Sequence, residues 1–141
     1  MTLEYTTEQQ PTIEQLLYLY NDARWSSYTK HPDQLKQAIE QSAFVLVCYD
    51  GGELVGLLRA ISDETTILYI QDILVLKAYK RKGIGSALMQ KTLEAYRHIR
   101  QIVLLTDDSP ETRAFYKSHG LQSCDDGKLV AFAKFNPNGG A

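Results

Sequence analysis

The pattern that decides the fold lies in residues 70–89, which read Ile70-Gln71-Asp72-Ile73-Leu74-Val75-Leu76-Lys77-Ala78-Tyr79-Lys80-Arg81-Lys82-Gly83-Ile84-Gly85-Ser86-Ala87-Leu88-Met89. The run 70–76 is apolar, rich in β-branched residues and of strand length. A basic turn follows, and two glycines then open a segment of helical periodicity, whose apolar face is Ile84, Ala87, Leu88, Ala95 and Ile99. A helix that begins with free N–H groups, a positive dipole end and glycines suits an anion, so the stretch predicts a phosphate-binding loop.

Two familiar phosphate loops do not fit this stretch. A dinucleotide-binding turn needs a small residue three positions after its second glycine, where Leu88 stands. A P-loop closes with Gly-Lys-Ser/Thr, whereas Gly85 is followed by Ser86 and Ala87. A plain glycine-containing loop with a solvated basic run stays open as an alternative, because two glycines alone are a weak signal.

The bulk properties indicate one globular domain spanning 1–141. Apolar residues make up 44% of the 141 residues and charged residues 23%, and the net charge of −2 gives no reason to expect a nucleic-acid partner. Cys48 and Cys124 show no metal-ligand spacing, which favours free thiols in a reducing cytoplasm and no metal. No apolar run approaches the ~20 residues of a membrane span, so no membrane partner is expected. Residues 136–141 are expected to form a flexible tail.

The chain reads as alternating strands and helices. Strands are expected at 2–6, 43–49, 53–61, 66–76, 102–106 and 129–135. Helices are expected from Thr12, which can form a capping box with Gln15, from Pro32, from the glycine loop to about His98, and over 110–118. Residues 21–31 read as an aromatic loop. This order predicts a mixed α/β layer fold.

Two motifs resemble those of one family, the GNAT N-acetyltransferases. Residues 80–85 are similar to its pyrophosphate loop, Gln/Arg-x-x-Gly-x-Gly/Ala, although Lys80 replaces the usual Gln or Arg, and Lys77 stands where proline is common. Residues 110–121 resemble the family's late helix, which commonly ends Phe-Tyr-x-x-x-Gly-Phe; here Leu121 replaces the last Phe and Ser109 the usual Asn. The order of elements matches over essentially the whole chain. The resemblance implies an α/β (α+β) fold with a central, mostly antiparallel sheet, flanking helices and strands that splay at the cofactor site.

The resemblance also implies acetyl-CoA as co-substrate. Its pantetheine arm would lie along the open edge of 71–76, with the Leu74 amide, by position, polarising the thioester carbonyl. Ser109 and Thr112 could contact the cofactor, although helix capping explains Ser109 at least as well. The expected cofactor contacts are Ile73, Leu74, Val75, Lys80, Arg81, Lys82, Gly83, Ile84, Gly85, Ser86, Ser109, Thr112 and Phe115.

Asp72 and Arg59 are charged residues that interrupt apolar strands. A half-buried carboxylate is costly unless it is paired or functional. Asp72 is therefore either the general base that takes the acceptor's proton, as acidic residues on this strand do in many family members, or the partner of Arg59 in an ion pair. Both can hold, with Arg59 orienting Asp72; if Asp72 is structural, the base is water or another carboxylate such as Glu64.

Tyr116 matches the family's usual general acid, which protonates the departing CoA thiolate; the alternative is a core aromatic, because Phe115 or Tyr116 must pack. Trp25 and Tyr28 lie in the loop that often walls the acceptor site in this family, and they are assigned with Arg59 to substrate binding. Surface aromatics or a dimer contact would explain Trp25 and Tyr28 equally well.

These observations predict a cytoplasmic acetyl-CoA-dependent N-acetyltransferase. The acceptor is expected to be the primary amine of a small molecule, attacking directly in a ternary complex, and a homodimer is expected by analogy. The Trp25 loop and residues 71–75 are also similar to aralkylamine acetyltransferases. The alternatives are acetylation of a protein lysine or N-terminus, and a non-catalytic CoA-binding sensor.

Overall fold

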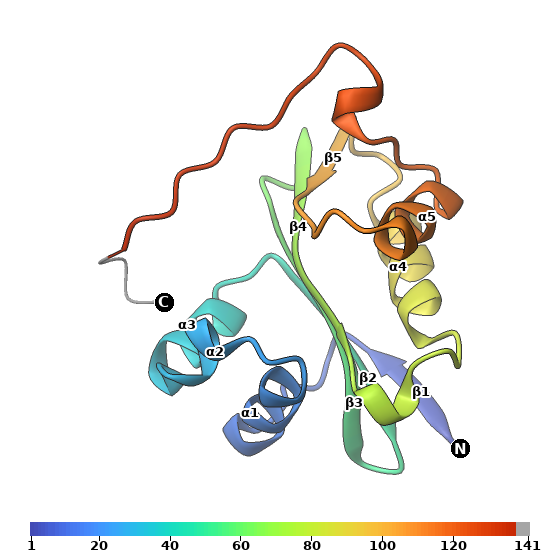
Figure 1. Ribbon diagram of the computed structural model, residues 1–141. Coiled ribbons are helices and arrows are strands. Elements are labelled where there is room, and N and C mark those ends of the chain that lie inside the picture. Colours follow the sequence, from blue (N-terminus) through green and yellow to red (C-terminus); the bar gives the residue numbers. More distant parts are fainter. Residues whose placement is uncertain (138–141) are drawn as a thin grey trace.

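The computed structural model describes residues 1–137, which form a five-stranded sheet with helices on both faces (Figure 1). The strands lie in the order β1-β2-β3-β4-β5; every neighbouring pair is antiparallel except β4 and β5, which are parallel. The strands are β1 (Leu3–Thr6), β2 (Phe44–Asp50), β3 (Glu53–Ser62), β4 (Ile67–Val75) and β5 (Gln101–Leu104). The helices are α1 (Ile13–Asp22), α2 (Ser26–Thr29), α3 (Pro32–Glu40), α4 (Ile84–Ala95) and α5 (Pro110–Ser118), with 3₁₀ turns η1 (Lys77–Tyr79) and η2 (Cys124–Asp126).

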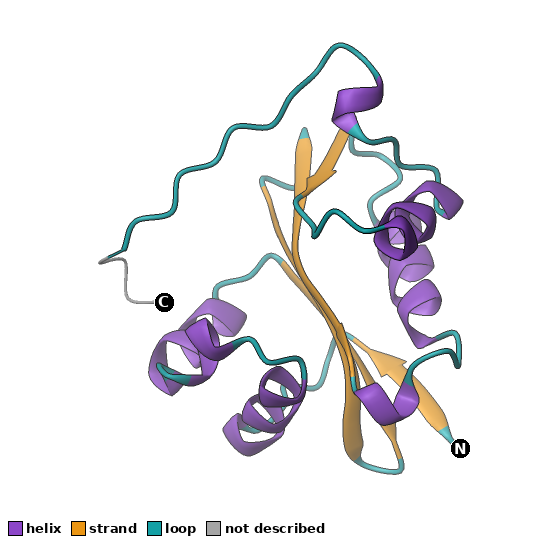
Figure 2. Ribbon diagram, viewed as in Figure 1, coloured by secondary structure: helices purple, strands orange, loops and turns teal. Residues whose placement is uncertain are grey.

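The helices form two layers. Helices α1, α2 and α3 cover one face of the sheet, whereas α4 and α5 lie on the other (Figure 2). The largest fully buried side chains come from α1, α3, β2, β3, β4 and α4, so one core runs through all three layers. Within the described residues, no helix is long and apolar enough to span a membrane.

Local signals in the sequence set most of the element ends. Thr12 and Gln15 form the expected capping box at the start of α1, and Pro32 is the first residue of α3. The β2–β3 hairpin turns through Gly51 and Gly52, both with positive φ. The strand and helix order expected from 2–6 through 110–118 is therefore confirmed, with end shifts of one to three residues.

A β-bulge in β4 sets the geometry of the sheet at its functional end. Arg59 of β3 faces Asp72, but the next residue, Ala60, faces Ile70, so Gln71 is left without a partner on β3. The parallel pairing with β5 also stops at Ile70, which faces Leu104. From Gln71 to Val75, β4 is therefore paired on one side only, which is the splay that the resemblance implied.

Gly56 of β3 lets α4 approach the sheet closely. A Cβ atom at this position would lie 2.9 Å from Ile84 Cγ2 and 3.4 Å from the Leu74 carbonyl oxygen. Only glycine leaves room for the first turn of α4 at this distance, so the sheet directly fixes where that helix begins.

Several expectations are corrected by the structure. The strand expected at 129–135 is wrong: these residues are extended but pair with no strand in residues 1–137, and all are exposed. The aromatic loop contains the short helix α2, and the long helix ends at Ala95, itself exposed, rather than near His98. The tail expected at 136–141 falls outside the described residues from 138 on; Asn136 and Pro137 are exposed.

Candidate active site

The unpaired edge of β4 offers backbone hydrogen-bonding groups to a ligand. The Leu76 N–H donates to the Val55 carbonyl at 2.9 Å, which fixes the antiparallel ladder with β3. Because bonded residues alternate along such a ladder, Leu74 bonds to β3, whereas the N–H and C=O of Ile73 and Val75 point to the open edge. The expectation that the Leu74 amide polarises a carbonyl is therefore corrected: this strand presents the Ile73 amide instead.

The N-terminus of α4 presents free amides next to this edge. Gly83 is the N-cap with φ 82°, and Arg81 also has a positive φ of 65°, so the chain turns sharply twice before the helix. In residues 1–137, no protein acceptor is recorded for the N–H groups of residues 81–86, and no Cβ contact would arise at Gly83 within 4 Å. Such successive amides at a helix start bind phosphate.

The basic side chains of this loop are available to a ligand. Lys80, Arg81 and Lys82 are all exposed, and none forms an ion pair within the described chain. Ile84 is buried in the core, so its expected contribution to a cofactor is its backbone, and Ser86 lies exposed in the first turn. The arrangement gathers positive charge and free donors at one point, as a pyrophosphate requires.

Helix α5 packs its aromatic pair beside α4. A Cβ atom at Gly85 would lie 3.6 Å from Phe115 Cζ and 3.9 Å from Val75 Cγ2, so Phe115 fills the space between α4 and α5. Tyr116 lines a cavity with Thr106, beyond the end of β5. Burial raises the pKa of the Tyr116 phenol, and the neighbouring Thr106 side chain opposes this in part. Tyr116 therefore keeps its proton at neutral pH.

Ser109 and Thr112 act on each other. Ser109 is the N-cap of α5: its hydroxyl accepts from the Thr112 N–H at 3.1 Å and lies 2.7 Å from the Thr112 hydroxyl. The capping interpretation of Ser109 is thereby confirmed. Its expected contact with a cofactor stays a prediction.

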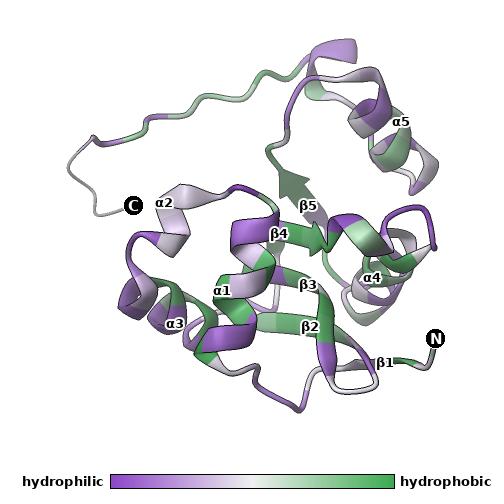
Figure 3. Cartoon of the chain, turned by 60° about the horizontal axis from the view of Figure 1, so that its bottom comes forward, coloured by the Kyte–Doolittle hydropathy of each residue, from purple (hydrophilic) through white to green (hydrophobic). Residues whose placement is uncertain are grey.

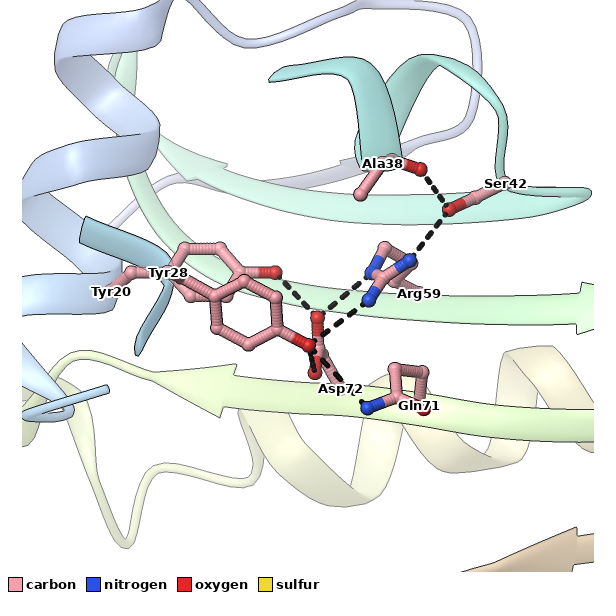
Figure 4. Close-up of polar contacts among 7 residues, drawn as sticks. All are labelled: Tyr20, Tyr28, Ala38, Ser42, Arg59, Gln71 and Asp72. Carbon is pink, nitrogen blue, oxygen red and sulfur yellow. Dashed lines mark hydrogen bonds and ion pairs between the residues drawn. The ribbon is translucent and has the colours of Figure 1, made fainter. Parts of the chain in front are cut away.

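Asp72 lies at the centre of a buried polar network (Figure 4). Its Oδ2 accepts from Arg59 Nε at 2.8 Å and from the Tyr20 hydroxyl at 2.9 Å, and its Oδ1 accepts from the Tyr28 hydroxyl at 3.1 Å. Asp72 is 2% exposed and Arg59 6%. Burial alone would lower the pKa of the Arg59 guanidinium, but Asp72 outweighs it and raises that pKa. The ion pair expected from the sequence is confirmed.

Arg59 also ties this network to α2 and α3. Its Nη2 donates to the Tyr28 hydroxyl at 3.1 Å, and its Nη1 donates to Ser42 Oγ at 3.2 Å, which in turn donates to the Ala38 carbonyl at 2.7 Å (Figure 4). Each of the three guanidinium nitrogens thus donates a hydrogen bond, and such bonds help a buried ionic group to be tolerated.

Trp25 and Tyr28 belong to an aromatic cluster with Tyr20. The ring centroid of Tyr20 lies 5.9 Å from the ring centroid of Trp25 and 5.1 Å from that of Tyr28. Burial first, and then the Asp72 carboxylate, raise the pKa of both Tyr20 and Tyr28. The exposed Gln71 of the bulge reaches the Tyr28 hydroxyl at 3.4 Å, so Tyr28 links the buried carboxylate to the surface beside the open edge.

Glu64, the alternative base, lies at the other end of the strand. It precedes β4 and accepts a hydrogen bond from the Tyr96 hydroxyl at 2.8 Å. The open edge begins only at Gln71, and the four residue steps of β4 from Ile67 to Gln71 alone span roughly 13 Å. Glu64 is therefore too far from the edge to act there.

Three contributors to the site were not predicted from the sequence. Tyr20 lies on the buried face of α1, and its hydroxyl donates to Asp72. The other two are the bulge at Gln71 and Thr106, which lies beside Tyr116. A tyrosine on an apolar helix face is a usable signal, because a buried hydroxyl needs a partner, whereas nothing in the residue types marks the bulge.

Together these features define a fold in which an anion-binding helix start meets the point where two parallel strands separate. Residues 3–137 match the sequence model of the acetyltransferase (GNAT) domain, so the chain belongs to the GNAT acetyltransferase family. A Gibberella zeae protein named as an acetyltransferase is 33% identical over 73 residues; the match covers 50% of this chain and 40% of that protein.

Solved structures share the fold over nearly the whole chain. A GNAT-family acetyltransferase from Streptococcus pneumoniae TIGR4 has a TM-score of 0.85 and 27% identity, covering 97% of this chain and 100% of that one. An aminoglycoside acetyltransferase from an uncultured soil metagenomic sample, in complex with sisomicin, has a TM-score of 0.69 and 21% identity, covering 96% and 95%. The latter likeness concerns the fold alone.

Proposed function

We propose that this protein is an N-acetyltransferase that transfers the acetyl group of acetyl-CoA to a primary amine of a small molecule. The observation that carries the proposal is the open edge of β4 from Gln71 to Val75, next to the free amides at the start of α4. The edge of β4 offers a row of backbone hydrogen-bonding groups, and the N-terminus of α4 offers amides that can bind an anion. A ligand with amides and a pyrophosphate, as CoA has, fits both together.

Different groups of the chain bind the phosphates and the pantetheine arm of the cofactor. The amides of residues 81–86 and the charges of Lys80, Arg81 and Lys82 hold the phosphates. The outward backbone groups of Ile73 and Val75 pair with the pantetheine amides as an added strand would. Gly83 is needed for its left-handed turn, which aims the amides outward.

The thioester supplies the acetyl group, and the chain supplies donors and a proton. The Ile73 amide stabilises the oxyanion that forms when the amine nitrogen attacks the carbonyl carbon. The C–S bond breaks, and Tyr116 gives its proton to the departing thiolate, while the attacking nitrogen releases its own proton to water or, through Tyr28, to Asp72. Tyr116 lies on α5, on one face of the sheet. The Asp72 network is held on the opposite face by Tyr20 of α1 and Tyr28 of α2. The amine therefore approaches from the Tyr28 side and the thiol leaves on the Tyr116 side.

The half-buried Trp25 and Tyr28 and the exposed Gln71 supply the acceptor side with aromatic and polar groups. Aromatic faces bind the apolar body or the cationic head of an amine. The sisomicin complex of the fold relative makes aminoglycosides a natural part of a test panel. Acetylation of a protein lysine or N-terminus remains the alternative substrate class.

The test is release of free CoA thiol from acetyl-CoA across aralkylamines, polyamines, aminoglycosides and lysine peptides. Turnover on a small amine supports the proposal. Turnover confined to peptides replaces it with the protein-directed alternative. Tight acetyl-CoA binding without turnover on any amine favours the non-catalytic sensor, and absence of acetyl-CoA binding by calorimetry overturns the proposal.

Gly83→Val is expected to weaken acetyl-CoA binding by about 10–100-fold. The side chain strains the left-handed turn and covers the amides, removing one or two charge-assisted hydrogen bonds of about 1.5 kcal/mol each. Gly52→Val is the matched control, because Gly52 also has positive φ (96°) and open space around it, but lies in the β2–β3 hairpin. Calorimetry should show weaker binding only for Gly83→Val, whereas both melting temperatures fall by similar amounts. Equal affinities in two folded variants would contradict the assignment.

A further inference from the structure

The carboxylate of Asp22 lies at a position that the local structure disfavours. Asp22 is the last residue of α1, at the negative end of the helix dipole, and the last turn of α1 contains no basic residue. It is half-buried and takes part in none of the ion pairs of residues 1–137. The apolar middle of α1 gives way to hydrophilic residues at this end (Figure 3). A charge that conflicts with its own helix is expected to serve a contact elsewhere in the fold.

That contact is with the start of η1, which is distant in the sequence. Asp22 Oδ2 accepts a hydrogen bond from the Lys77 N–H at 2.7 Å. Lys77 is the first residue of η1, so no carbonyl within this turn can accept from its N–H. A carboxylate that accepts from a backbone N–H at such a position forms one of the stronger hydrogen bonds in proteins. The bond therefore joins the end of α1 firmly to the beginning of η1.

The turn η1 positions the loop that carries the free amides. The N–H groups of residues 81–86 have no recorded acceptor in residues 1–137, so η1 on one side and α4 on the other hold this loop. At the far end of η1, the Tyr79 hydroxyl donates to Asp50 Oδ2 at 2.7 Å, which ties the turn to the β2–β3 hairpin. Asp22 supplies the corresponding tie to α1. The place of the phosphate-binding amides thus depends in part on the end of α1.

On its other side, Asp22 leads directly to the aromatic residues of the acceptor side. Trp25 follows through a tight turn, in which the Arg24 N–H donates to the Asn21 carbonyl at 2.9 Å and the Trp25 N–H to the Tyr20 carbonyl at 3.1 Å. Arg24 has a positive φ of 63°. Because this turn is closed by hydrogen bonds to the last turn of α1, a displacement of Asp22 is passed on to Trp25.

We propose that Asp22 is a positioning residue, whose bond to Lys77 fixes Trp25 and Tyr28 relative to the loop that binds the phosphates of the cofactor. The inference rests on the proposed function and adds to it a residue that binds neither proposed ligand. Lys77 stands where proline is common in the family, and proline has no N–H. This chain therefore has both a donor at that position and an acceptor opposite it.

The two halves of the bond can be removed separately. Asp22→Ala removes the acceptor, and Lys77→Pro removes the donor. The backbone admits this proline, because Leu76 before it is extended (φ −53°, ψ 139°) and proline suits the first position of a helical turn. Lys77→Ala keeps the N–H and controls for the lost charge. Glu40→Ala controls for Asp22→Ala, because Glu40 is the exposed last residue of α3 and its side chain has no recorded hydrogen bond within residues 1–137.

Trp25 reports on the acceptor side, because it is the only tryptophan among the 141 residues. Its fluorescence emission should shift in Asp22→Ala and in Lys77→Pro without any ligand, and should match wild type in both controls. Calorimetry should show acetyl-CoA binding weakened about fivefold or more in each of the two variants, and unchanged in Glu40→Ala. The double variant should bind no more weakly than either single variant, because both substitutions remove the same bond.

The outcomes distinguish this inference from the proposed function. If wild type does not bind acetyl-CoA, the proposed function fails and the inference fails with it. If wild type binds and a folded Asp22→Ala variant binds equally well with unchanged Trp25 emission, Asp22 contributes only to stability, and the inference alone is overturned. Tighter binding by Asp22→Ala overturns it too, because the carboxylate then only repels the phosphates. Additive losses in the double variant would show that Asp22 and Lys77 act independently, which also contradicts it.

Discussion

Tyr116→Phe is expected to lower kcat by about 10²-fold or more while leaving acetyl-CoA affinity nearly unchanged. The substitution keeps the ring between α5 and the end of β5 and removes only the hydroxyl that gives a proton to the thiolate, and general acid catalysis is worth roughly 10²–10⁴-fold. Burial keeps the phenol protonated, because its pKa is raised above its usual value. The activity of wild type should therefore not be lost through Tyr116 until the pH exceeds about 10.

The matched control for Tyr116→Phe is Tyr96→Phe. Tyr96 is buried and Tyr116 half-buried, and burial is the main cause that raises the pKa of both phenols. The Tyr96 hydroxyl donates to Glu64, so Tyr96→Phe should lose about 1 kcal/mol of stability with that hydrogen bond, and Tyr116→Phe no more than this. Only Tyr116→Phe should lose turnover in single-turnover measurements, where product release cannot mask the chemical step. Equal kcat values for the two variants would assign Tyr116 to packing.

The fold followed from the sequence wherever local chemistry dictates structure. The capping box at Thr12, the proline that opens α3 and the glycine turn at 51–52 each act over a few residues, so their outcome can be read without the rest of the chain. The Arg59–Asp72 pair was one of the two interpretations of Asp72, because a hairpin that turns near Asp63 brings the two charged residues together, and the structure confirms it.

The features that the sequence did not predict depend on contacts between segments far apart in the chain. The bulge at Gln71 comes from a one-residue shift in the β3–β4 register, and in the ladder beyond it the groups of Ile73 rather than those of Leu74 face the open edge. Residues 129–135 have strand composition, but a strand forms only where an edge is available to it. The composition of this segment predicts a strand, but the described residues offer it no pairing, so the prediction is wrong.

Asp72→Asn is expected to lower the free energy of unfolding by about 3–5 kcal/mol, because it leaves Arg59 as an uncompensated charge in a buried site. The hydrogen bonds themselves can largely survive: the amide oxygen can accept from Arg59 and Tyr20, and the Tyr28 hydroxyl can turn to accept from the new NH₂ group. Adding Arg59→Gln to this variant removes the uncompensated charge and should recover part of the loss. Denaturant unfolding of the single and double variants measures both effects.

The pH dependence of turnover then separates pairing from base catalysis. In the described network, Asp72 reaches the surface beside the open edge only by way of Tyr28, which bonds the exposed Gln71. If Asp72 takes the acceptor's proton, that proton must therefore pass through Tyr28. Tyr28→Phe keeps the Arg59–Asp72 pair and removes the hydroxyl that bonds Asp72, Gln71 and Arg59 Nη2. Under base catalysis, both Asp72→Asn and Tyr28→Phe lose turnover near pH 6 and regain it toward pH 10, where the amine arrives already neutral. Under pairing alone, Asp72→Asn melts earlier with a pH profile parallel to that of wild type, and Tyr28→Phe changes little. We expect the second result, because both oxygens of Asp72 are already bonded by Arg59, Tyr20 and Tyr28; recovery of both variants at high pH would contradict it.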